Sequence, residues 1–415
     1  MSLELKLTYP EYLDSFSCVG PACTDSCCVS WVIGVDKKTY FKYKNNHGTD
    51  ELHKKLRTLV RKRKQFSSKQ DYAKIELDKD RRCSFLDTDD LCTIQKAMGH
   101  DALCGTCITY PRNYYSIKGK NYLSAVFSCP EVAKIALLDQ NDFKLITKNK
   151  EVNEKSPINY YKLSKMDNNY LVYDNFEKIQ NISLSIMKNR DLTLEKRLML
   201  LGILVDKISK VSLSHPENVN KIIEELSNED TIKLYSDQFA NIKSRHFIQL
   251  KTIFEITSSA MEYETDQNQY EQYVRRAVDA ILKGAKSDEQ ALDHYIVDGL
   301  RQYGRFFQDK EYIIENYLIN SMISKAFPAS IKGDGFDIFL NYLKIIVDFV
   351  ILRTILAGLL IEEGELEIDD LLNLIQKHSK KLSHNLYIVN NIIDNLKEEN
   401  MYSLAGALVL INTVN

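Results

Sequence analysis

Apolar residues recur every three or four positions over most of the second half of the chain, which is the spacing of an α-helix with one buried face. Residues 194–208, 270–282 and 368–375 show this pattern most clearly. Proline is rare in this part, since only two of the seven prolines follow Pro157. The pattern predicts an all-helical domain over residues 158–415.

The most apolar stretch covers residues 339–361 and is long enough to suggest a membrane span. Lys344, Asp348 and Arg353 interrupt this stretch, and charged residues in the middle of a membrane are costly. We therefore expect a buried helix here and no association with a membrane.

The first 138 residues have a less regular pattern, with prolines and glycines between short apolar runs. Short helices are expected over residues 37–43, 50–64 and 93–98, and over residues 131–138 after Pro130. Residues 139–157 are polar and predict a linker. The chain is thus predicted to be mainly α, with a loop-rich cysteine and metal-binding module at 1–138, a polar linker at 139–157 and an all-α domain at 158–415.

Composition agrees with a water-soluble protein of two or three domains. The 415 residues are 44% hydrophobic and 27% charged, with a net charge of -2. No basic excess indicates nucleic-acid binding. The first residues carry charges, tyrosine and proline where a signal peptide needs an apolar core, which favours a cytoplasmic location.

Cysteine is the residue type with the most uneven distribution. All nine cysteines lie between Cys18 and Cys129, and chance alone would place them there with a probability on the order of 10⁻⁵. Cytoplasmic thiols are kept reduced, so a dense set of cysteines there indicates metal binding or catalysis before disulfides. The sequence therefore predicts a metal site in this part of the chain.

The spacing of the cysteines suits iron-sulfur clusters or zinc, because short loops let neighbouring sulfur atoms converge on one centre. The candidate ligands are Cys18, Cys23, Cys27, Cys28, Cys83, Cys92, Cys104, Cys107 and Cys129. Eight thiolates make two zinc sites, or four hold one cluster and leave the rest with other roles. Adjacent side chains diverge, which favours different centres for Cys27 and Cys28. A cluster with three thiolate ligands keeps one iron open for a small ligand.

Two other features carry weaker chemical signals. His100 lies close to Cys104 and suits a metal site and an ordinary role equally well, whereas the other seven histidines are dispersed. The basic run 61–64 favours a solvated helix face over a contact with an acidic partner. No general base is identified.

Several enzyme signatures are missing from the chain. No G-x-G-x-x-G follows an apolar strand, so a dinucleotide site or the glycine-rich loop of a doubly wound methyltransferase is not indicated. P-loop, G-x-S-x-G and H-E-x-x-H motifs are also absent from the sequence.

Four ordered motifs carry a resemblance to a known family. They are FSCVGPACTDSCCVSW at residues 16–31, RCSFLDTDDLCTI at 82–94, ALCGTCITYPR at 102–112 and SCPEVA at 128–133. Together they closely resemble the flagellin lysine N-methylase family. The N-terminal part is also similar to the broader zinc- or iron-chelating CxxCxxCC group, although the spacing here, C-x4-C-x3-CC, is longer.

The resemblance implies a protein-lysine N-methyltransferase that acts on flagellin with S-adenosylmethionine as methyl donor, and it gives the domain at 158–415 the role of recognising this protein substrate. It also implies an iron-sulfur cluster, of the 4Fe-4S type, with zinc as the alternative metal, and it covers all nine cysteines. We expect an open iron to orient the donor. The C-x3-C-x2-C set of radical enzymes is not present, because Ser30 stands where its third cysteine belongs. Competing hypotheses are a non-catalytic zinc- or iron-binding module and an electron-transfer protein.

Overall fold

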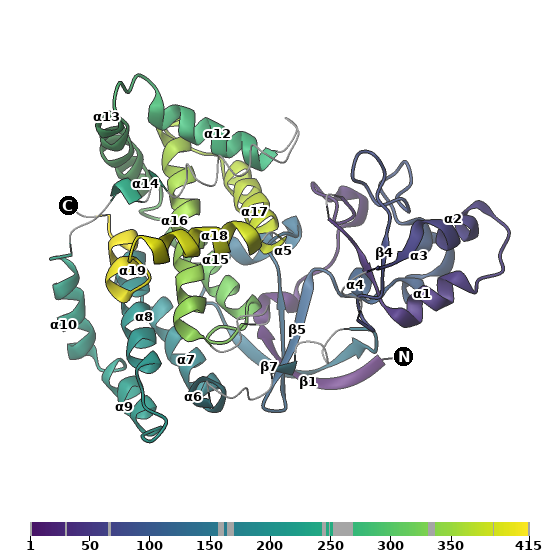
Figure 1. The fold of residues 1–415 in the computed structure, drawn as a ribbon, viewed down its shortest axis with the longest axis horizontal. Coiled ribbons are helices and arrows are strands. Elements are labelled where there is room, and N and C mark those ends of the chain that lie inside the picture. Colours follow the sequence, from purple (N-terminus) through teal and green to yellow (C-terminus); the bar gives the residue numbers. More distant parts are fainter. Residues whose placement is uncertain are drawn as a thin grey trace. The chain divides into compact units, whose positions relative to one another are not determined.

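A computed structural model describes residues 2–29, 31–64, 68–156, 162–163, 170–242, 246–248, 250–251, 269–330, 337–384 and 386–413. The chain divides into two compact units. Unit 1 comprises Met1–Ile135 and Lys144–Leu163, and unit 2 comprises Ala136–Phe143 and Ser164–Asn415. Figure 1 shows strands in unit 1, from purple to blue, and helices throughout unit 2, from teal to yellow. The expectation of a mainly α fold is confirmed.

Unit 1 mixes short helices with strands. Its strands are β1 (Ser2–Pro10), β2 (Gly34–Val35), β3 (Val60–Lys62), β4 (Ala73–Ile75), β5 (Arg112–Ile117), β6 (Lys120–Ala125), β7 (Leu145–Asn153) and β8 (Lys162–Leu163). Its helices are η1 (Glu11–Asp14), η2 (Gly20–Ala22), α1 (Lys37–Lys44), α2 (Glu51–Leu59), α3 (Thr93–Met98), η3 (His100–Ala102), α4 (Gly105–Thr109) and α5 (Pro130–Leu137), the last of which continues into unit 2.

Five strands form one sheet in the order β7-β1-β6-β5-β8. Strand β1 pairs antiparallel with β7 and parallel with β6. Strands β5 and β6 form a hairpin whose two turn residues, Lys118 and Gly119, both have positive φ angles. Such a turn matches the twist of the two strands.

A smaller sheet of unit 1 has the order β2-β4-β3. Its apolar residues, among them Ile33, Val35 and Ile75, pack with Phe85 and Leu103 into a hydrophobic core. Segments carrying cysteines contribute to this core, so the sheet positions the thiols described below.

Unit 2 is helical in its described part. Its elements are α6 (Tyr170–Asp174), α7 (Phe176–Met187), α8 (Leu194–Ser209), α9 (Asn218–Glu225), α10 (Glu229–Phe239), α12 (Gln269–Leu282), α13 (Asp288–Asp293), η5 (His294–Leu300, a π-helix), α14 (Arg301–Phe306), α15 (Glu311–Ser324), α16 (Ile338–Glu363), α17 (Ile368–His384), α18 (Leu386–Glu398) and α19 (Leu404–Ile411).

Helix α16 is the most apolar segment and forms the core of unit 2. The expected buried helix is confirmed, because nearly all of its residues are buried, including Asp348 at 2% exposure and Arg353 at 1%. None of the helices in the described part of the chain combines the length and the apolar character that a membrane crossing requires.

Two segments differ from the sequence-based expectation. The stretch expected as a linker, 139–157, contains β7, which pairs with β1 over its whole length. Its polar composition reflects an edge strand that stays partly solvated. The helix expected over 50–64 ends at Leu59, because residues 60–62 pair with β4. The basic run 61–64 therefore begins on a strand, not on a helix face.

Candidate functional site

All nine cysteines are free thiols and lie in unit 1. Cys18 and Cys27 are exposed, and Cys83, Cys104 and Cys129 are buried. The remaining four have intermediate exposure. Unit 1 thus offers a set of soft sulfur donors that differ in their access to solvent.

Five of the thiols belong to the hydrophobic core beside the small sheet, and we call them the core thiols: Cys28, Cys83, Cys92, Cys104 and Cys107. Backbone contacts draw their segments together. The amide of Cys83 donates to the carbonyl of Cys28 at 2.8 Å, and Cys92 forms an isolated β-bridge with Leu86. The fold therefore gathers cysteines from three of the four sequence motifs around one core.

Cys104 and Cys107 form a close pair among the core thiols. Cys104 is the N-cap of α4 and Cys107 lies within that helix, which places the two Sγ atoms 3.6 Å apart. Two thiolates on a tetrahedral zinc ion lie about 3.8 Å apart when the Zn–S bonds are about 2.3 Å long. A hydrogen bond between these thiols lowers the pKa of Cys104 and raises the pKa of Cys107. The pair fits two ligand positions of a metal centre.

The other four cysteines, which we call the outer thiols, are Cys18, Cys23, Cys27 and Cys129. Burial raises the pKa of Cys23, and the nearby Cys27 and Cys18 add to this rise. Burial also raises the pKa of Cys129 to about 11, with further contributions from Cys23 and Cys18. Charges influence one another in this way only at short range, so the outer thiols form a second group.

Cys27 lies at the border between the two groups. Burial raises the pKa of Cys83 to about 12 and raises the pKa of Cys92, and Cys27 adds to both rises. Cys27 is exposed, whereas the adjacent Cys28 packs against the core. The two neighbours in sequence therefore face different surroundings.

The donor set has the chemistry that an iron-sulfur cluster or zinc requires, with two groups of at least four free thiols. Within the described ranges, no three His, Cys, Asp or Glu side chains are arranged as a ready-made metal site. His100 is exposed on η3. Burial disfavours the thiolate form of several of these cysteines, and a bound cation would reverse that preference.

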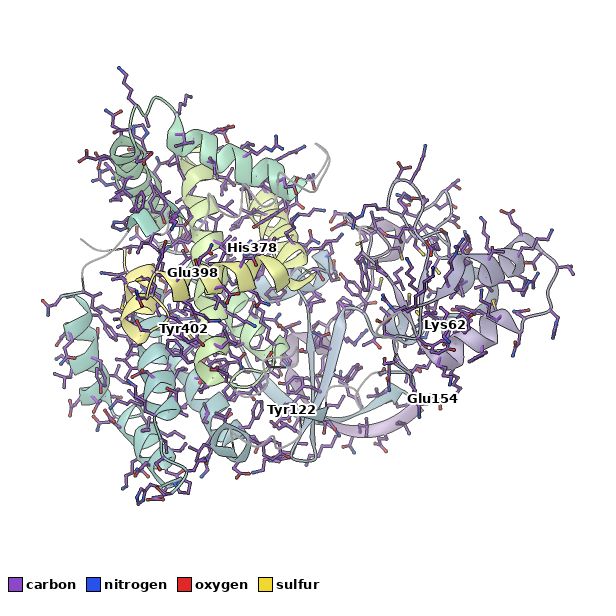
Figure 2. All side chains as sticks on the ribbon, in the orientation of Figure 1. Lys62, Tyr122, Glu154, His378, Glu398 and Tyr402 are labelled. Carbon is purple, nitrogen blue, oxygen red and sulfur yellow. The ribbon has the colours of Figure 1, made fainter. Side chains whose placement is uncertain are left out.

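A buried polar network joins four helices of unit 2. Asp348 on α16 accepts hydrogen bonds from Tyr317 on α15 at 2.7 Å, from Nε2 of His378 on α17 at 2.8 Å and from Lys325 at 2.8 Å. The other ring nitrogen of His378 lies 2.9 Å from the hydroxyl of Tyr270 on α12. Figure 2 shows His378 among these helices.

Four members of the network are closed to solvent, because Asp348, His378, Tyr270 and Tyr317 are each at most 2% exposed. Burial alone would raise the pKa of Asp348, but Lys325 and His378 outweigh it and hold this pKa well below its usual value. The arrangement fixes the helices relative to one another. Sequence analysis singled out Asp348 only as a charge in an apolar stretch and missed its partners.

A cavity of about 470 Å³ lies in unit 2, at the start of α8, along α14 and at the start of α15. It is lined by Arg190, Asp191, Leu192, Thr193, Leu194, Glu195, Leu300, Tyr303, Gly304, Phe307, Gln308, Glu311 and Thr413. Its volume lies in the usual range for sites that bind small molecules or side chains. No sequence motif indicated it.

Comparison with known proteins gives a consistent result. A model of the FliB lysine N-methylase C-terminal domain matches residues 180–410. A lysine-N-methylase of Salmonella choleraesuis is 24% identical over 94% of both chains, and so is a lysine-N-methylase of Salmonella typhimurium. The flagellar biosynthetic protein FliU of Salmonella muenchen is 33% identical over 34% of this chain and 83% of its own length. No solved structure matches the chain.

Proposed function

Because the chain belongs to the FliB lysine N-methylase family, we propose that it is a lysine N-methyltransferase that modifies flagellin with S-adenosylmethionine as methyl donor. The observation that carries the proposal is the match to the Salmonella lysine-N-methylases, which spans both units. The reaction is proposed to take place in the cytoplasm, where thiols stay reduced.

The proposed chemistry is a direct displacement. The lone pair of a neutral lysine amine forms a new N–C bond to the sulfonium methyl group, while the electrons of the S–C bond return to sulfur and leave a thioether. The amine then releases a proton. The protein must deprotonate the amine, because only the neutral amine is a nucleophile. It must also align nitrogen, carbon and sulfur, and such alignment can supply a large part of the rate increase.

We assign different roles to the two thiol groups on the basis of their exposure. The outer thiols include the exposed Cys18 and Cys27, so a centre held there is accessible to a small molecule. The core thiols are enclosed by apolar side chains, which suits a structural metal such as zinc. An iron-sulfur cluster held by three of the four outer thiols would keep one iron open for the amino and carboxylate groups of the donor.

Co-expression with flagellin tests the proposed activity. Mass spectrometry should find methyl groups on flagellin lysines when the full chain is present and none when it is absent. Cys129→Ser removes one outer thiol and should abolish the modification. Unmodified flagellin beside a folded, metal-loaded chain would support a non-catalytic metal-binding module instead.

Metal content tests the assignment of the thiol groups. Anaerobically purified protein should be brown, with iron lost in Cys129→Ser and retained in Cys104→Ser. A colourless protein that contains only zinc would overturn the iron-sulfur assignment.

A further inference from the structure

The cavity in unit 2 combines aromatic and acidic groups. The rings of Tyr303 and Phe307 lie 4.6 Å apart between centroids and are tilted by 42°. Asp191, Glu195 and Glu311 also line the cavity. Aromatic faces together with carboxylates are the surroundings that bind alkyl cations in proteins.

The carboxylate of Glu195 forms one long ion pair in the described part of the chain. Its nearest cation is Arg353, at an N–O distance of 3.9 Å, which is too long for a hydrogen bond. Arg353 instead donates to the carbonyls of Leu410 and Ile411. In the described part of the chain, no donor forms a hydrogen bond with Glu195, so its carboxylate is available to a ligand.

Tyr303 supplies a second unused polar group. The residue is only 8% exposed, and its hydroxyl forms no hydrogen bond within the described part of the chain. The hydroxyl is not among the fully enclosed polar atoms that lack a partner, so it reaches the open space of the cavity. Burial raises the pKa of Tyr303, and the nearby Glu195 adds to the rise, which places both groups at the same part of the cavity.

Carboxylates outnumber cations among the charged residues that line the cavity. Arg190, the one cationic residue that lines it, is held by Glu315 at 2.9 Å. Glu311 pairs with Arg197. The α8 N-terminus carries a partial positive charge, which Glu195 in its first turn offsets. Asp191 is then a further negative charge at the cavity wall.

The backbone keeps the cavity open. Gly304 lies in α14, and a Cβ atom added there would have no other atom within 4 Å. The preceding segment, η5, is a π-helix that ends at Leu300, another lining residue. π-helical turns are rare and concentrate at functional sites.

We propose that this cavity receives the side chain of the substrate lysine, with its nitrogen at Glu195 and Tyr303 and its methylene groups against the aromatic rings. The identity of the ligand rests on the proposed function. A methylated lysine keeps its charge and loses hydrogen-bond donors, so the aromatic rings also suit the product.

Direct binding to the full chain tests the proposal without any turnover. The probes are N-acetyl-lysine amide and, as the matched neutral ligand, N-acetyl-norleucine amide, both observed by NMR titration. We expect the lysine probe to bind at least about tenfold more tightly than the norleucine probe, and Glu195→Gln to remove about that factor. Tyr303→Phe should weaken binding less. Glu229→Gln, which makes the same change outside the cavity, should have no effect.

A steric variant provides an independent test. Gly304→Leu fills the open space with a better helix former, so the fold should persist in circular dichroism while the lysine probe no longer binds. Unchanged lysine binding in both Glu195→Gln and Gly304→Leu would overturn the proposal. Loss of S-adenosylmethionine binding in Gly304→Leu, with lysine binding intact, would assign the cavity to the donor and overturn it as well.

The two proposals fail in different ways. If flagellin is methylated and Glu195→Gln does not change lysine binding, the proposed function is supported and the cavity is not the lysine site. If Glu195→Gln weakens lysine binding but flagellin is not methylated, the cavity is supported as a lysine site and the proposed function is wrong.

Discussion

The two units bury different kinds of polar group. Unit 1 contains all nine cysteines, and burial raises the pKa of several of them. Unit 2 contains no cysteine and buries charges as pairs, such as Arg197 with Glu315 at 2.5 Å. The two charges of this pair stabilise each other, whereas we propose that a cation stabilises the thiolate form of the thiols in unit 1.

This contrast can be followed with two separate signals. Trp31 is the single tryptophan of the chain and lies in unit 1, where its indole nitrogen donates to the carbonyl of Cys27 at 2.6 Å. Its fluorescence therefore reports on unit 1. Far-ultraviolet circular dichroism mainly reports on the helices of unit 2.

Removal of the central carboxylate of unit 2 should have the largest effect. Asp348→Ala leaves Lys325 and His378 without their partner, and we expect the free energy of unfolding from circular dichroism to fall by about 3–5 kcal/mol. Asp309→Ala, at an exposed site, should leave it unchanged. Equal urea transitions for both variants would show that the network does not stabilise unit 2.

Replacement of a core thiol should lower the stability of unit 1 by a smaller amount. Cys104→Ser places a hydroxyl in a buried position, and we expect the transition seen by Trp31 fluorescence to lose about 1–3 kcal/mol. Cys18→Ser changes an exposed thiol and should leave that transition in place. The separation into core and outer thiols would be wrong if the two variants were equally unstable.

Low pH should lower the stability of unit 2, because it protonates the same carboxylate. The folded-state pKa of Asp348 is lowered, so its contribution to stability is present above the unfolded pKa of about 3.9 and is lost as the pH falls toward the folded value. The circular dichroism transition should therefore lose stability below about pH 4, and Asp348→Asn should remove this dependence. An identical acid profile in the variant would contradict the assignment.

Two glycines should give the smallest effects, with opposite signs. Gly304→Ala adds a side chain to open space in a helix and should stabilise unit 2 by about 0.5–1 kcal/mol. Gly105→Ala should destabilise unit 1, because its Cβ would lie 2.8 Å from the carbonyl oxygen of Lys155. Thermal unfolding of the two variants measures both signs.

Local patterns predicted the helices well. The helix expected over 93–98 is observed as α3 with the same bounds, and the apolar stripe from Leu194 lies on α8. Alternation along Leu3, Leu5, Leu7 and Tyr9 was the available signal for β1, and it was overlooked. Strand β7 could not be predicted from its own residues, because its partner β1 lies more than a hundred residues earlier in the chain.

The candidate sites show the same difference between local and long-range signals. Clustering in sequence revealed the thiols, because their motifs are local. Asp348 and His378 meet through packing between separate helices, and so do Glu195 and Tyr303 at the cavity. No local spacing encodes such pairs, and only the fold shows them.

The central claim is tested most directly by the transfer of a labelled methyl group. The full chain, purified without oxygen, is incubated with flagellin and methyl-deuterated S-adenosylmethionine, and the lysines are analysed by mass spectrometry. We predict deuterated methyl groups on flagellin lysines, absent with Cys129→Ser while the helix signal stays unchanged. A metal-loaded chain that binds the donor and transfers no label would contradict it.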